Sequence, residues 1–168
     1  MSVGADGEAA AELKKRAPEF VLRDIDGNSV RLSDYAGKTV LIDFWATWCG
    51  PCVDSLPHLN KAHVSETGLD LVVLAVNIES LDIARQFVSD REYEFITLID
   101  EANKARRLYD VDAIPTTFLV DRFGVLRDRM VGGSSVSLKL ALWAEKMRRL
   151  LDIRREPGTG KETDDVAL

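Results

Sequence analysis

Two almost wholly apolar stretches predict the centre of a β-sheet. Residues 40–45 read Val-Leu-Ile-Asp-Phe-Trp, and residues 69–78 are equally rich in Leu, Val and Ile. Apolar runs without polar alternation are typical of strands that are covered on both faces of a sheet. Shorter apolar runs predict three further strands, at 95–99, 116–120 and 125–130.

Alternating and helical patterns predict the remaining elements. Residues 20–23 and 29–32 alternate apolar and polar positions around an Asp-Gly pair at 26–27, which predicts a hairpin. Helices are predicted at 49–67, 81–90 and 102–109, and after Ser135. Pro57 falls inside the first of these helices and should kink it. Asp100 is the candidate cap of the third.

The order of these elements predicts one α/β domain, a mixed sheet flanked by helices. A chain of 168 residues suits a single domain with a full core. We expect this domain to span residues 17–151. Residues 1–16, rich in Ala, Gly and Glu, are predicted to be a flexible arm, and the polar residues 152–168 a disordered tail.

The charge and the hydropathy of the chain make some classes of binding partner less plausible. The chain carries 22 basic and 28 acidic residues, a net charge of −6, which disfavours general binding of nucleic acid or of anionic membranes. No apolar run approaches the length that spans a bilayer. Residues 1–17 lack the basic start and apolar block of a secretion signal. The protein is therefore either cytoplasmic or exported by a signal or anchor that this sequence does not contain.

The candidate chemistry lies directly after the first apolar stretch. Both cysteines, Cys49 and Cys52, stand in the run Trp-Cys-Gly-Pro-Cys at the predicted start of a helix. Cys-x-x-Cys beside a βαβ pattern is typical of a redox motif. Free backbone N–H groups at a helix N-terminus favour the reactive thiolate of Cys49. The alternative, an inert pair or a structural disulfide, is disfavoured by the motif and its context together.

Asp43 is the one polar residue in the first apolar stretch. Burial of an ionised carboxylate is costly, so we expect the pKa of Asp43 to rise. The alternative is an Asp43 that faces solvent and makes a cap or a surface ion pair.

Three further segments carry a resemblance to a known family. They are Ala-Pro-Glu-Phe at 17–20, Leu-Ser-Asp at 32–34 and Phe-Trp-Ala-Thr-Trp-Cys at 44–49. Together with the cysteine motif they make the chain resemble the thioredoxin-like thiol–disulfide oxidoreductases of the TlpA/ResA type, the redoxin family, over roughly residues 17–150. The resemblance implies a thioredoxin fold with an extra N-terminal hairpin and a strand–helix insert, here residues 81–99.

The resemblance also implies a role for each residue of the motif. Cys49 would be the exposed nucleophile that attacks a substrate disulfide, and Cys52 the buried thiol that resolves the mixed disulfide. Gly50 and Pro51 would set the geometry and the reduction potential, and Gly-Pro is the pair found in thioredoxins, which are mostly reductants. The redox-active disulfide would replace any dissociable cofactor.

A second loop is expected to face the cysteines. Ile114-Pro115-Thr116 matches the family's cis-proline loop, which would turn the backbone of Ile114 toward the cysteines. By itself an X–Pro bond is cis in only about 5% of cases, so a trans proline at a strand start is the alternative. The expected substrate-binding residues are Trp48, Gly50, Pro51, Ile114, Pro115 and Gly132.

Two acids match family positions near the cysteines. Asp43 matches the thioredoxin acid that relays protons to and from the resolving cysteine, although the usual lysine partner is Ala75 here. Glu79 matches the acid that TlpA/ResA-type proteins carry near their cysteines. Alternatively, Glu79 stabilises the N-terminus of the next helix through the helix dipole.

The resulting expectation is a monomeric reductant of protein disulfides that an upstream thiol reductant supplies with electrons. The resemblance implies an extracytoplasmic protein that acts in cytochrome c maturation or thiol maintenance. The alternatives are a cytoplasmic thioredoxin fed by a thioredoxin reductase, and a non-catalytic binding module. A metal is not expected, because His58 and His63 have no recognised ligand spacing to the thiols. A peroxidase is not expected either, because a Pro-x-x-x-Thr-x-x-Cys run is missing.

Overall fold

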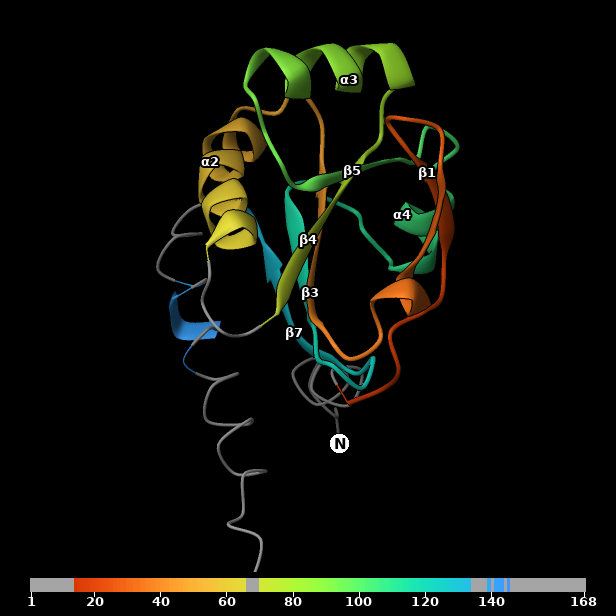
Figure 1. Cartoon of the computed structure of the whole chain (residues 1–168), viewed down its shortest axis with the longest axis vertical. Helices are drawn as coiled ribbons and strands as arrows, with labels where there is room; N and C mark the ends of the chain where they lie inside the picture. Colours follow the sequence, from red (N-terminus) through yellow and green to blue (C-terminus); the bar gives the residue numbers. More distant parts are fainter. Residues whose placement is uncertain (1–13, 66–69, 134–138, 140, 144, 146–168) are drawn as a thin grey trace, which may run out of the picture.

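A seven-stranded mixed sheet forms the centre of the computed structural model (Figure 1). The structure describes residues 14–65, 70–133, 139, 141–143 and 145. The strands are β1 (Val21–Asp24), β2 (Ser29–Arg31), β3 (Thr39–Trp45), β4 (Leu71–Asn77), β5 (Ile96–Ile99), β6 (Thr116–Val120) and β7 (Leu126–Val131). They lie in the order β2-β1-β5-β4-β3-β6-β7. The helices are η1 (Leu32–Tyr35), α2 (Gly50–Val64), α3 (Leu81–Asp90) and α4 (Lys104–Leu108). This arrangement confirms the predicted thioredoxin-like α/β fold.

Strand β3 is an interior strand of the sheet, as its sequence predicts. It pairs in parallel with β4 and antiparallel with β6, and all seven of its residues are buried. Alternate side chains of β3 point to opposite faces. Leu41 and Trp45 belong to the core layer that contains Cys52, whereas Ile42 and Phe44 belong to the layer on the other face. In Figure 1, α2 and α4 lie on opposite sides of the sheet.

The predicted N-terminal hairpin forms from β1 and β2, with Leu22 opposite Val30. Gly27 in the turn has φ +89°, a conformation that glycine adopts without a steric cost. The carboxylate of Asp24 accepts the backbone N–H groups of Asp26 and Asn28 at 2.9 and 2.8 Å. Antiparallel pairing of β1 with β5 then attaches the hairpin to the main sheet.

Helices α2 and α4 are shorter than the sequence predicts, whereas α3 spans the predicted residues 81–90. Helix α2 begins one residue after Cys49 and ends at Val64, with Pro57 inside it. Helix α4 covers five residues, and Asn103 rather than Asp100 occupies its N-cap position. The Asp100 carboxylate nevertheless accepts the first three backbone N–H groups of α4, at 2.7 to 3.2 Å. It therefore satisfies the helix N-terminus as a cap does.

The ends of the described chain pack against the last hairpin. The backbone carbonyl of Lys15 accepts the N–H of Leu126 at 3.0 Å, just before the predicted domain start. Residues 139, 141–143 and 145 are helical, and the indole N–H of Trp143 donates to Asp128 at 3.0 Å. Ser135 and the predicted tail lie outside the described residues, so the domain boundaries stay predictions. Within the described chain, no helix has both the length and the apolar character needed to cross a bilayer.

Candidate active site

The two cysteines form a disulfide at the N-terminus of α2. Cys49 is the N-cap residue, and the backbone N–H of Cys52 points at its sulfur, with N and Sγ 3.3 Å apart. Cys49 is 6% exposed and Cys52 is fully buried. The two sulfurs are therefore unequal in the order that the sequence predicts. Among the described residues, Cys49 keeps a small exposed fraction and Cys52 keeps none.

Local geometry makes Cys49 the better place for negative charge. Helix α2 has 15 residues, has no acid in its first turn, and carries Pro51 where no intrahelical N–H is required. When the disulfide is reduced, the free N–H groups at this helix end stabilise a thiolate on Cys49. The arrangement thus provides one accessible nucleophilic sulfur and one enclosed sulfur that can displace it.

The loop before β6 lies beside the disulfide, as the sequence predicts. The Ile114–Pro115 peptide bond is cis, and the carbonyl oxygen of Ile114 lies 3.8 Å from Cys49 Sγ. The carbonyl of Pro115 accepts the backbone N–H of Gly132 at 2.8 Å. This bond joins the proline loop, which lies beside Cys49, to the chain at the end of β7.

Gly133 is a site residue that sequence reasoning missed. A Cβ placed on Gly133 would lie 2.5 Å from the backbone oxygen of Pro51, closer than real Cβ atoms approach. The chain after β7 can therefore lie against the cysteine motif only because residue 133 is glycine. The Gly-Gly pair at 132–133 was the available signal, but only Gly132 was predicted as a site residue.

The two tryptophans of the motif have opposite environments. Trp48 is 69% exposed and stands next to Cys49, whereas Trp45 is fully buried. The indole of Trp45 packs on Phe87, with ring centroids 5.4 Å apart. An exposed flat apolar side chain beside an accessible sulfur is suited to contact a peptide chain. The substrate-binding role of Trp48 stays a prediction.

Asp43 is fully buried, which excludes the alternative of a solvent-facing carboxylate. Burial raises the pKa of Asp43 to about 7, and a hydrogen bond from Thr117 partly offsets this effect. The Thr117 hydroxyl donates to Asp43 Oδ1 at 2.7 Å. Ala75 is the partner of Asp43 on β4, so no lysine stands at that position and Thr117 supplies the polar partner instead. Sequence reasoning missed Thr117, although its place two residues after Pro115 in a buried strand was a signal.

The carboxylate of Glu79 holds the segment that precedes the cysteines. It accepts the backbone N–H of Thr47 at 2.6 Å and the Thr47 hydroxyl at 2.9 Å. The side-chain amide of Asn77 donates to it at 3.2 Å. Glu79 thus bonds to the residue two positions before Cys49 instead of serving only the N-terminus of α3. This contact links the end of β4 to the loop between β3 and α2.

The structure places neither histidine in a group of three or more metal-binding side chains of the described residues. In the part of the chain that the structure describes, no group of three or more His, Cys, Asp or Glu side chains is placed to hold a metal ion. His63 Nδ1 accepts the backbone N–H of Val73 at 3.1 Å, and burial lowers the pKa of His63. His63 therefore has a structural partner on the sheet.

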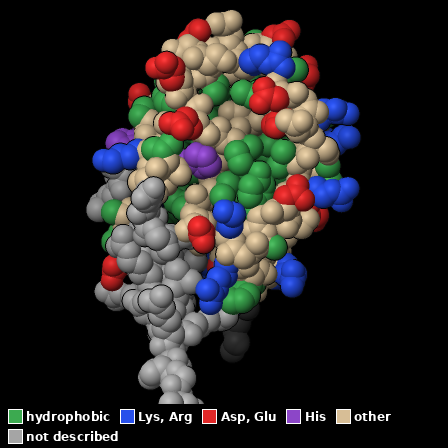
Figure 2. Space-filling view, in the orientation of Figure 1, with side chains coloured by type: hydrophobic (Ala, Val, Ile, Leu, Met, Phe, Trp, Pro, Cys, Tyr) green, Lys and Arg blue, Asp and Glu red, His purple; other side chains and the backbone are tan. Residues whose placement is uncertain are grey.

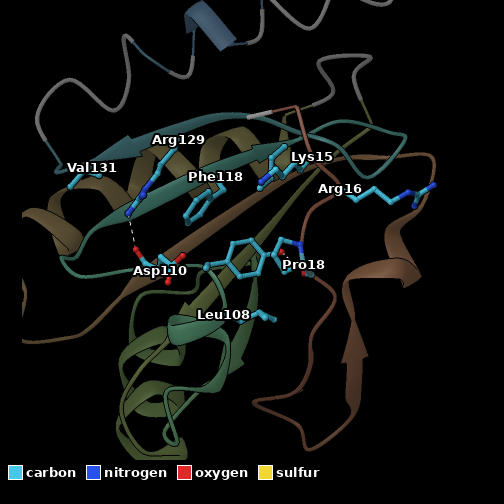
Figure 3. A pocket seen from close by; sticks show the side chains of 10 residues that line it. Lys15, Arg16, Pro18, Leu108, Asp110, Phe118, Arg129 and Val131 are labelled. Carbon is cyan, nitrogen blue, oxygen red and sulfur yellow. Dashed lines mark hydrogen bonds between the residues drawn. The ribbon is translucent and has the colours of Figure 1, made fainter. Parts of the chain in front are cut away.

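A separate groove of about 470 Å³ lies beside β6 and β7 (Figure 3). Its lining combines apolar and charged side chains, namely Lys15, Arg16, Pro18, Leu108, Tyr109, Asp110, Phe118, Leu126, Arg129 and Val131. The guanidinium of Arg129 crosses it and donates to the carbonyl of Asp110 at 2.9 Å (Figure 3). The lining includes none of the residues around the disulfide.

On the face in Figure 2, acidic and basic side chains are interspersed around a central apolar area.

A thioredoxin-like sheet with a Cys-x-x-Cys disulfide at a helix N-terminus, facing a cis-proline, defines a thiol–disulfide oxidoreductase. Comparison with known proteins agrees. Residues 13–129 match the AhpC/TSA family. The chain belongs to this redoxin family, and within it to the thiol–disulfide oxidoreductases of the TlpA/ResA type.

Individual relatives show how far the similarity extends. The thiol–disulfide oxidoreductase ResA of Bacillus thuringiensis subsp. konkukian is 32% identical over 126 residues, which cover 74% of this chain and 73% of ResA. A Chlorobium tepidum protein provisionally named thiol:disulfide interchange protein DsbE has 34% identity and a TM-score of 0.72, over 79% of this chain and 94% of its own. The exposed lipoprotein thioredoxin Etrx1 of Streptococcus pneumoniae has 32% identity and a TM-score of 0.66, over 76% of this chain and 99% of Etrx1.

Proposed function

We propose that this oxidoreductase reduces disulfides in other proteins and is itself oxidised to the Cys49–Cys52 disulfide. The Cys49 thiolate attacks one sulfur of the substrate disulfide, and the other substrate sulfur leaves as a thiolate. Cys52 then loses its proton and attacks Cys49 Sγ in the mixed disulfide, which releases the second substrate thiolate. Two electrons pass to the substrate, and an upstream thiol reductant restores the dithiol.

The unequal exposure of the two sulfurs carries this proposal. A structural disulfide has no need for one slightly exposed cysteine beside a peptide carbonyl. Here the accessible sulfur of Cys49 lies 3.8 Å from the carbonyl oxygen of Ile114. An extended substrate strand could donate a backbone N–H to that oxygen while it presents its disulfide to Cys49. Trp48, Gly132 and the Gly50-Pro51 pair would form the rim that it contacts.

Asp43 is proposed as the proton relay for the enclosed cysteine. It lies on the face of β3 whose core layer contains Cys52. Since its pKa is about 7, the carboxylate can take up a proton near neutral pH and return it in the reverse step. Glu79 is proposed to position the sulfur of Cys49 through its two hydrogen bonds to Thr47.

The names of the relatives support a place outside the cytoplasm, since one solved neighbour is an exposed lipoprotein. We therefore propose an extracytoplasmic monomer, and the family resemblance favours cytochrome c maturation or thiol maintenance as its task. Its substrates would be protein disulfides. A thiol reductant would supply its electrons, and no metal or nucleic acid would take part.

Trapping of the mixed disulfide tests the assignment of the two sulfurs. Cys52→Ser should accumulate a covalent adduct with a disulfide-containing protein, because nothing remains to resolve it. Cys49→Ser should form no adduct, since Cys52 is buried. Non-reducing gels followed by mass spectrometry measure both. Equal adducts on the two variants would refute the assignment. A binding module would retain its partner in the Cys49→Ser variant, whereas an oxidoreductase would lose disulfide turnover.

The direction of electron flow needs its own measurement. Equilibration with a thiol redox buffer gives the reduction potential of the Cys49–Cys52 pair. A potential near or below about −270 mV, as in thioredoxin, supports a reductant. A potential near about −120 mV, as in strong oxidants, would contradict it.

A further inference from the structure

A row of four buried side chains crosses the sheet on the face of the enclosed cysteine. Thr117 on β6 pairs with Asp43 on β3, Asp43 pairs with Ala75 on β4, and Ala75 pairs with Thr97 on β5. Partners in register point to the same face. This face carries the core layer that includes both Ala75 and Cys52. Each of the four side chains is at most 2% exposed.

Two polar atoms in this row lack a hydrogen bond. Among the described residues, neither Asp43 Oδ2 nor Thr97 Oγ1 has a partner. The other oxygen of Asp43 accepts the hydroxyl of Thr117. Folded proteins pair nearly all of their buried polar atoms, and they use internal water where no protein group is within reach. Asp43 Oδ2 and Thr97 Oγ1 lie on either side of Ala75, so one hydrogen-bonding partner could serve both atoms.

A direct bond between the two atoms is excluded by the spacing of the sheet. Asp43 and Thr97 stand on strands two apart, which separates their backbones by about 10 Å. Both side chains are short, and a hydrogen bond needs about 3 Å between heavy atoms. Ala75 lies between them, and its methyl group fills much less of the layer than a larger side chain would. A single oxygen above this methyl group could lie within hydrogen-bonding distance of both atoms.

We propose that one internal water molecule binds above Ala75, accepts a hydrogen bond from the Thr97 hydroxyl and donates one to Asp43 Oδ2. Both oxygens of the Asp43 carboxylate then have a donor, and Thr97 becomes a positioning residue for the carboxyl. The water would lie over the methyl group of Ala75, between the two polar side chains. The importance of this water for turnover rests on the proton relay proposed above. The presence of the water does not depend on that relay.

Few other groups can disturb a titration of Asp43. Burial and the Thr117 hydroxyl determine its pKa, without a contribution from a nearby charge. The apolar residues of this core layer and its margin include three titratable side chains, Cys49, Cys52 and Tyr93. At its edge, His63 accepts the backbone N–H of Val73, and the Glu79 carboxylate accepts that of Thr47. The cysteines cannot titrate in the disulfide form, and burial raises the pKa of Tyr93 above its usual value of 10.0. In the oxidised protein the carboxyl signal therefore reports Asp43 and its partners.

The test follows the Asp43 carboxyl carbon by NMR against pH in the oxidised protein. Thr97→Val removes, at nearly constant shape, the hydroxyl that holds the water. Loss of the water should raise the titration midpoint by roughly one pH unit, because the ionised carboxylate then loses its donor at Oδ2. Thr97→Ser keeps the hydroxyl and should titrate like the wild type. Thr117→Val removes a hydrogen bond that is present and serves as the positive control. Ala75→Val should expel the water and raise the midpoint as Thr97→Val does.

A double variant at Thr97 and Ala75 distinguishes a shared water from two independent effects on the titration midpoint of Asp43. Combined with Ala75→Val, Thr97→Val should add almost nothing, since both changes remove the same donor. A high-resolution crystal structure of the wild type should show the water between the two oxygens. An empty site, a Thr97→Val midpoint equal to that of the wild type, or fully additive shifts would each overturn the inference. Turnover of Asp43→Asn at the wild-type rate would instead refute the relay and leave the water intact.

Discussion

Replacement of the buried carboxyl, Asp43→Asn, should remove a specific part of the protein's pH-dependent stability. In the folded protein the pKa of Asp43 is about 7, against 3.8 for an unperturbed group. Between these values the folded state holds a proton that the unfolded state has lost. The free energy of unfolding therefore falls as pH rises through this window, by about 1.4 kcal/mol per pH unit. Over about three units the loss amounts to roughly 4 kcal/mol.

The difference in stability between Asp43→Asn and the wild type isolates this contribution, because the other titrating groups cancel. We expect the unfolding free energy of the variant minus that of the wild type to rise steadily from about pH 4.5 and to level off above about pH 7. Urea unfolding of the oxidised protein, followed by tryptophan fluorescence, measures both. Thr117→Val should move the levelling point to higher pH, since it removes the hydroxyl that favours the ionised form. A difference independent of pH would show that the folded protein ionises Asp43 as readily as the unfolded chain, and would refute the reasoning.

Two further predictions concern the packing around the cysteines. Glu79→Gln weakens the charge-assisted bonds to Thr47, so we expect a loss of roughly 1–3 kcal/mol in unfolding free energy and slower disulfide turnover. The exposed Glu101→Gln is the matched control, and equal behaviour of the two variants would contradict the anchoring role. Gly133→Ala places a methyl group against the backbone of Pro51 and should cost roughly 1–3 kcal/mol and alter the reduction potential, as measured by urea unfolding and redox equilibration. An unfolding free energy and a reduction potential equal to those of the wild type would mean that the segment after β7 moves away from Pro51 without cost.

Local patterns predicted much of the fold because the informative residues are close in sequence. The almost wholly apolar run at 40–45 predicted β3, which is buried on both faces. The Asp-Gly pair at 26–27 predicted the first hairpin, and the Ile114-Pro115 loop was recognised from the resemblance. Helix ends were less predictable: α2 was expected at 49–67 but ends at Val64. Helix propensity changes little from one residue to the next at a helix end, so tertiary packing decides where the last turn stops.

The partners of the site residues were harder to predict, because they depend on register between distant segments. Thr117 bonds to Asp43 across 74 positions of sequence, and Thr47 bonds to Glu79 across 32. A shift of one residue in strand pairing would turn Thr117 to the other face of the sheet. The sequence therefore indicated a buried acid on β3 and an acid after β4. It did not indicate which hydroxyl each acid would bind.

The close approach of Gly133 to Pro51 restricts how this enzyme can be re-engineered or can diverge in evolution. Dipeptides between the cysteines are an obvious means of changing an oxidoreductase from reductant to oxidant. Here the backbone oxygen of Pro51 leaves no room for even a methyl group on residue 133. A new dipeptide that altered the backbone path would collide with the segment after β7. Compensating changes at 132–133 would then have to accompany a transplanted motif, so a dipeptide library should vary both segments together.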